Sequence, residues 1–173
     1  MGTVRTKFVR EMAGKVLAEC GITEPPIDLK HVVEVKGFVY MEVDTFPDNV
    51  SALFIAKGGQ NYALVNTKHH PNRQRFSLAH ELGHIILQHK AVDLEEDVST
   101  IDTPPENTGD TRHRDPREKE ADIFASALLI PLGMLKKEHS KKDVDIEKLA
   151  KVFAVSQQAM TIAVMDNLSS LME

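Results

Sequence analysis

The sequence predicts an α+β fold, with a small antiparallel sheet packed beside one central helix, further helices, and a C-terminal helix-turn-helix-like hairpin. Three observations support it. Apolar residues recur at helical spacing near the N-terminus, a strand-like period begins at Phe38, and helical patterns return after residue 70. With 173 residues, 42% of them apolar and 27% charged, the chain has ordinary globular composition and enough length to bury a core.

The N-terminal part supplies two helices and then the sheet. Residues 4–20 carry apolar side chains at helical spacing, and Asp28 can cap a short helix that ends at Val35. Gly58-Gly59-Gln60 forms the turn of a hairpin. Runs rich in apolar and β-forming residues predict three strands, at 38–43, 51–56 and 62–66.

The C-terminal part is predicted to be helical. A helix is expected at 72–88, followed by a polar stretch at 91–114 that we interpret as a long surface loop. Asp115-Pro116 opens the next helix, which must end before Pro131. The last two helices, at 146–153 and 156–168, form the hairpin. We expect a main domain at residues 1–135 and a helical hairpin at 136–173 packed on it.

The helix at 72–88 contains His80-Glu81-Leu82-Gly83-His84. Histidines four residues apart lie on one helical face, so both imidazoles can bind one metal ion. Glu81 is rotated by about 100° from His80, which places it beside the metal as a general acid/base. Gly83 costs a helix interior about 1 kcal/mol relative to Ala. Close approach of another backbone or helix at the metal is one reason for a glycine there, and simple tolerance is the alternative. The motif predicts a zinc centre (Zn2+) with Glu81 as catalytic residue.

A catalytic zinc ion usually has three protein ligands, so one more is expected from elsewhere in the chain. Two glutamates after Asp115 compete for this role. Glu118 falls at the third helical position, where a capping box employs it. Glu120 extends the apolar stripe of its helix, where a carboxylate must be paired or bind a metal. We predict Glu120 as the third ligand and keep Glu118 as the alternative.

These motifs resemble the ImmA/IrrE family of metallo-endopeptidases, which is gluzincin-like. The likeness rests on residues 75–84 and 118–131, with weaker similarity at 25–29 and 149–160. It implies that His80 and His84 bind zinc, that Glu81 is the general acid/base, and that Glu120, the glutamate preceding Ala121, is the third ligand. It also implies a protein substrate, such as a helix-turn-helix repressor of a phage, mobile element or stress operon.

The strand at 51–56 is the first candidate for substrate binding, because an extended peptide can add to a free sheet edge. The candidate residues are Ser51, Ala52, Leu53 and Phe54. Packing of these residues within the sheet is the alternative.

The C-terminal hairpin raises the question of DNA binding. Gln157 and Gln158 could reach bases, but no Lys or Arg lies between Ser156 and Glu173. The chain has 21 Lys and Arg against 26 Asp and Glu, a net charge of -5, whereas non-specific DNA affinity requires basic surface. We therefore expect the hairpin to pack on the core or to dock a partner protein.

Cysteine usage and the lack of long apolar runs indicate a cytoplasmic protein. Cys20 is the single cysteine, so no intramolecular disulfide can form. No run of 18 apolar residues and no signal-peptide-like start is present, so no membrane partner is expected.

We interpret the chain as a zinc-dependent endopeptidase that hydrolyses a protein or peptide substrate. One alternative is a regulatory protein that keeps zinc and binds a repressor without cleaving it. A DNA-binding regulator is a second alternative, and hydrolysis of a non-peptide amide is a third, since the same metal chemistry serves it.

Overall fold

The computed structural model describes residues 3–89, 115–141 and 145–172. It contains helices and a three-stranded sheet, which confirms the α+β class. The predicted loop at 91–114 lies outside the described residues. The helices and strands are α1 (Thr6–Glu19), α2 (Leu29–Val35), β1 (Phe38–Val43), β2 (Ala52–Lys57), β3 (Gln60–Asn66), α3 (Pro71–Ile86), α4 (Pro116–Leu129), α5 (Leu132–His139), α6 (Ile146–Phe153), α7 (Gln157–Asp166) and α8 (Leu168–Leu171).

The sheet is mixed rather than wholly antiparallel as predicted. Its order is β1-β3-β2, with β2 antiparallel to β3 and β1 parallel to it. The Gly58-Gly59 turn fixes the β2–β3 hairpin, and both glycines have positive φ. β1 ends opposite Asn66 of β3, and β2 starts opposite Val65, so the segment 44–51 only has to cross one end of β3.

Asn66 holds that crossing segment in place. Its side chain is fully buried, and Nδ2 donates to the carbonyl of Val50 at 2.7 Å. The backbone of Asn66 donates to the carbonyl of Ser51, and that of Thr67 to the carbonyl of Val43. These bonds place β2 at one edge of the sheet, and in the described ranges no strand pairs with its outer side.

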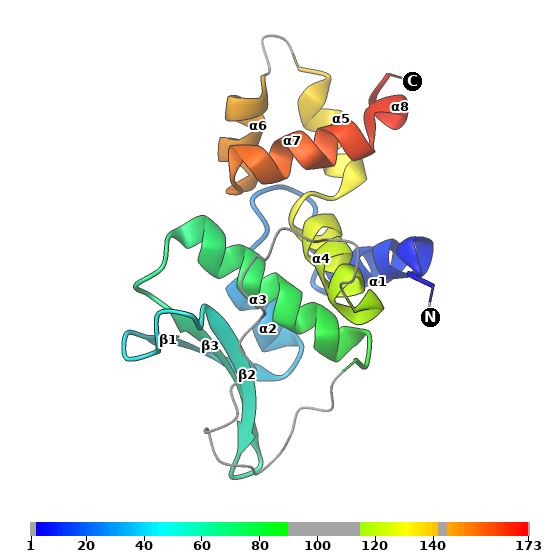
Figure 1. Cartoon of the computed structure of the whole chain (residues 1–173). Coiled ribbons are helices and arrows are strands. Elements are labelled where there is room, and N and C mark those ends of the chain that lie inside the picture. The colour runs from blue at the N-terminus through cyan, green and yellow to red at the C-terminus, as the bar shows by residue number, and fades with distance from the viewer. Residues whose placement is uncertain (1–2, 90–114, 142–144, 173) are drawn as a thin grey trace.

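The central helix α3 lies between the sheet and the C-terminal helices (Figure 1). α4 packs along α3, and α1 packs on α4. Gly83 permits the close approach expected from the sequence, because a Cβ atom there would lie 3.0 Å from Cδ1 of Phe124. Phe124 and Leu82 are fully buried at this contact between the two helices.

The C-terminal helices form the expected hairpin. Ala154 takes the left-handed conformation between α6 and α7, and the Ser156 hydroxyl accepts a hydrogen bond from the backbone N–H of Ala159. Leu149, Phe153 and Met160 belong to the same buried cluster as the residues of α3 and α4. No helix in the described ranges is long and apolar enough to cross a membrane.

Candidate metal centre

Two histidines of α3 form the base of the candidate site. His80 and His84 lie one helical turn apart, and their Nε2 atoms are 3.0 Å from each other. His84 is buried, with 2% of its surface exposed. His80 lies closer to the surface, with 13% of its side chain exposed. The helical spacing therefore brings both imidazoles to one point, as the motif predicted.

Glu118 of α4 reaches the same point from the neighbouring helix. One carboxylate oxygen, Oε2, lies 3.2 Å from Nε2 of His80, and the other, Oε1, lies 3.3 Å from Nε2 of His84. His80, His84 and Glu118 thus form a group that can hold a metal ion. Hydrogen bonds from the two imidazoles lower the pKa of the Glu118 carboxyl well below its usual range.

Glu120, the predicted third ligand, does not lie with the two histidines in this structure. The backbone N–H, Nε and Nη2 of Arg5 all donate to the Glu120 carboxylate, Nη2 at 2.6 Å. Nε2 of His89 lies 2.9 Å from the same carboxylate. Hydrogen bonding to the Arg5 side chain, against the effect of burial, lowers the pKa of Glu120 to about 2.

Helix geometry explains why the two glutamates face different partners. Residues two apart on a helix differ by about 200° in direction, so Glu118 and Glu120 cannot face the same partner. Asp115 caps α4 through the backbone N–H of Arg117, and no hydrogen bond from Glu118 closes a capping box in the described structure. Glu120 is buried, with 3% exposed, so its need for a partner was correctly inferred. That partner is Arg5.

Asp122 orients His80, the more exposed of the two histidines. Its Oδ1 lies 2.9 Å from Nδ1 of His80, which leaves Nε2 directed at His84 and Glu118. Burial alone would lower the pKa of His80, but hydrogen bonds to Asp122 and Glu118 outweigh it and raise the pKa to about 9. The group therefore attracts positive charge, which a proton or a metal cation can supply.

The donor atoms lie close enough together to share one metal ion. Nε2 of His80 and Nε2 of His84 are 3.0 Å apart, and each faces a different oxygen of Glu118, at 3.2 and 3.3 Å respectively. With one ligand atom taken from each of the three residues, these atoms lie within 4.8 Å of one another. A carboxylate behind a metal-binding imidazole, as at Asp122, is the usual second partner of such a histidine. Two imidazoles and one carboxylate have the donor chemistry that zinc accepts, and their spacing allows them to share one ion.

The other predicted site residues lie on the expected elements. Glu81 is half-buried on α3, next to His80. Ala52 begins β2 and Ser51 directly precedes it; both are buried, with 8% exposed each. Leu53 and Phe54 are half-buried on β2, and the Phe54 ring packs edge-on against Phe38 at 4.8 Å. The Ser51 hydroxyl contacts Arg73 and His69, so the side chains of both Ser51 and Phe54 have structural contacts.

Sequence reasoning missed three residues around the site. Asp122 could have been found, because it follows Glu118 by one helical turn and so shares its face. Arg5 could not have been found, since 115 positions separate it from Glu120. His89 has no sequence spacing to the other site residues that would have marked it. Its side chain is 5% exposed, and burial, which is the largest effect on its pKa, lowers that pKa.

An α+β fold with a His-His-Glu group where two helices meet is typical of a metallopeptidase-like protein. The model of the peptidase M78 family, described as an IrrE N-terminal-like domain, matches residues 42–165, and the chain belongs to this family. No curated protein sequence matches it. A solved structure described as a Mycobacterium tuberculosis transcriptional regulator is similar, with a TM-score of 0.61 and 18% identity over 89% of this chain. The chain spans 45% of that protein's length, and the likeness concerns the fold alone.

Proposed function

We propose that this chain is a zinc-dependent endopeptidase whose metal ligands are His80, His84 and Glu118. The convergence of these three side chains on one point carries the proposal. A zinc ion bound there would polarise the carbonyl of the scissile peptide bond and make a water molecule more acidic. Membership of a peptidase family supports this chemistry.

The residues of the chain would divide the remaining work. Glu81 flanks the histidines and would accept a proton from the attacking water and deliver it to the leaving amine. Asp122 would hold the His80 ring in the orientation that presents Nε2. Both roles need only side chains that already lie on α3 and α4.

A protein substrate would bind in extended form along β2. This strand is an edge of the sheet in the described ranges and contacts α3, which carries the histidines. Since the side chains of Ser51 and Phe54 have structural contacts, β2 would bind through its backbone, by addition of a strand. The substrate we propose is a helix-turn-helix repressor, as the family resemblance implies.

The test compares wild type with Glu81→Gln, both loaded with zinc, on a proteome-derived peptide library and on any repressor encoded beside the gene. Wild type is expected to cut, and the variant to bind zinc equally but to lose at least about 100-fold in rate. A variant that cuts as fast as wild type would remove Glu81 from the mechanism.

A zinc-binding regulator that cleaves nothing is the second candidate. The similar solved structure is described as a transcriptional regulator, which favours this reading. A peptidase needs a ligand position open to water, and a hydroxamate inhibitor would occupy it. Tight hydroxamate binding with cleavage supports the peptidase, whereas stoichiometric zinc without either supports the regulator.

A further inference from the structure

A cavity of about 340 Å³ lies between α3, α4 and the start of α7. Its walls are mainly apolar, with Phe76 from α3, Leu129 and Ile130 from the end of α4, and Val155 before α7. Polar groups come from His70, Asn72, Arg73, Ser126 and Ser156, and no acidic side chain is among the described residues that line the cavity. This volume is suited to a small ligand or a large side chain.

Two residues that line the cavity lie one helical turn from residues of the candidate metal centre, one on α3 and one on α4. α3 and α4 run in opposite directions, since His80 contacts Asp122 while His84 contacts Glu118. Phe76 precedes His80 by one turn, and their ring centroids are 6.4 Å apart. Ser126 follows Asp122 by one turn on the facing helix. The cavity therefore begins one turn, about 5.4 Å, from the metal centre.

The wall of the cavity is also joined to the edge strand. Nε of Arg73 donates to Oγ of Ser51 at 2.9 Å, and Ser51 directly precedes β2. Ser51 Oγ also lies 2.7 Å from Nδ1 of His69, whose Nε2 lies 2.8 Å from the carbonyl oxygen of Asp48. This chain of hydrogen bonds fixes the cavity wall relative to the strand along which the proposed substrate would lie.

We propose that this cavity binds one large apolar side chain of the substrate, such as Leu, Met or Phe, within about three residues of the scissile bond. An extended chain advances about 3.3 Å per residue, so two or three residues span the path from the metal centre into the cavity. Arg73 disfavours a Lys or Arg side chain there by charge repulsion. The inference rests on the proposed endopeptidase function and names the side chain that the enzyme selects.

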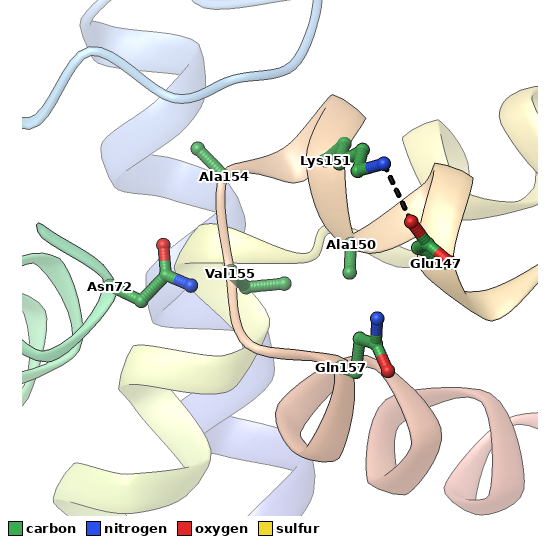
Figure 2. Close-up of a pocket in the computed structure, with 7 residues that line it drawn as sticks. All are labelled: Asn72, Glu147, Ala150, Lys151, Ala154, Val155 and Gln157. Atoms are coloured by element: carbon green, nitrogen blue, oxygen red, sulfur yellow. Dashed lines mark hydrogen bonds and ion pairs between the residues drawn. The ribbon is translucent and has the colours of Figure 1, made fainter.

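A second cavity of about 350 Å³, which shares Asn72 and Val155 with the first, provides a control (Figure 2). It is lined by the Glu147–Lys151 ion pair, with 2.6 Å between Nζ and Oε1, and by Gln157. No residue of α4 lines it, whereas Ser126 and Leu129 of α4 line the first cavity. Gln157 does not line the first cavity, so a substitution of Gln157 changes the same helical region without entering the proposed subsite.

The experiment fills each cavity in turn. Ser126→Leu and Ala159→Leu narrow the proposed subsite from α4 and from α7, and Gln157→Leu fills the control cavity. Each zinc-loaded protein digests a proteome-derived peptide library, and the cut sites are identified by mass spectrometry. Wild type and Gln157→Leu are expected to favour large apolar residues at one position within three residues of the cut. Ser126→Leu or Ala159→Leu should reduce that enrichment at least fivefold, with zinc affinity unchanged.

Two different results would overturn the inference. If wild type cuts without an apolar preference, or if both filling variants keep the wild-type preference, the cavity is not a subsite although the endopeptidase function stands. If zinc-loaded wild type cuts no peptide or repressor, the proposed function fails and this inference fails with it.

Discussion

Two glutamates two positions apart on α4 illustrate how direction, rather than residue type, decides a role. Glu118 is partly exposed and faces two imidazoles, whereas Glu120 is buried and is held by Arg5 and His89. Both carboxyls have a lowered pKa, because each accepts hydrogen bonds from nitrogen donors. Composition and lowered pKa therefore do not separate a metal ligand from a structural anchor; the facing partner does.

Substitution of the two glutamates tests this assignment. Glu118→Gln removes the charged ligand of the proposed metal centre. It should weaken zinc binding by more than about 100-fold, which exceeds the loss usual for a residue that only hydrogen-bonds to a ligand. Glu120→Gln should keep zinc affinity within a few-fold and lower the stability of the protein. The measurement is zinc affinity by competition with a chromogenic chelator, with thermal unfolding recorded in parallel. Weaker zinc binding in Glu120→Gln than in Glu118→Gln would reverse the assignment.

Asp122 should act on zinc through His80. Asp122→Ala removes the acceptor at Nδ1 of His80, so the ring loses its fixed orientation. We expect zinc affinity to fall about 10–100-fold, measured by the same competition. Ser126→Ala, one turn further along α4, is the matched control and should keep wild-type affinity. Unchanged zinc binding in Asp122→Ala would mean that packing alone orients His80.

At the scale of elements, the sequence predicts what local chemistry determines. The Asp28 and Asp115 caps, the Gly58-Gly59 turn and the histidine spacing all act within a few residues, and the structure has them as expected. The parallel pairing of β1 with β3 was not predictable, because it depends on how residues 44–51 cross the sheet. Which of the two glutamates faces the histidines likewise depends on which face of α4 meets α3.

The packing of α4 on α3 brings together the residues of the proposed metal centre, and Gly83 allows the two helices to approach closely. Gly83→Ala gains about 1 kcal/mol of helix propensity but forces a Cβ atom to 3.0 Å from Phe124, and overpacking of a core typically costs about 1–3 kcal/mol. We therefore expect lower stability and weaker zinc binding, from thermal unfolding and chelator competition.

Gly14→Ala in α1 is the matched control for that substitution. Gly14 is an exposed glycine in a helix interior, and a Cβ atom there would meet nothing within 4 Å. It should stabilise the protein by up to about 1 kcal/mol. If Gly83→Ala behaves in the same way and keeps its zinc affinity, the close approach of the two helices is not required.

At the scale of the whole molecule, the main domain and the C-terminal hairpin share one core. Leu149, Phe153 and Met160 are buried in the same cluster as Leu128 and Leu129 of α4. The predicted division at residue 135 therefore separates side chains that pack together. A fragment of residues 1–135 would expose apolar surface that the intact chain buries, and we expect poor dispersion in its amide NMR spectrum. A well-dispersed spectrum from this fragment would establish an independent domain.

Zinc should stabilise the whole fold, because its proposed ligands come from two helices that are far apart in the sequence. A ligand that binds only the folded state at 100 times its Kd adds about 2.7 kcal/mol, which corresponds to a rise in Tm of roughly 5–10 °C for a chain of this size. Thermal unfolding with zinc and with a chelator measures this shift. Mg2+ should give none, because it prefers oxygen ligands in octahedral geometry, and Glu118→Gln should lose most of it. Since Glu120 pairs with Arg5, Glu120→Gln should start from a lower Tm yet keep the full zinc-dependent rise. That pattern would distinguish Glu118 as the zinc ligand from Glu120 as a structural residue in one measurement. If Glu120→Gln alone lost the zinc-dependent rise in Tm, the proposed metal centre would be contradicted.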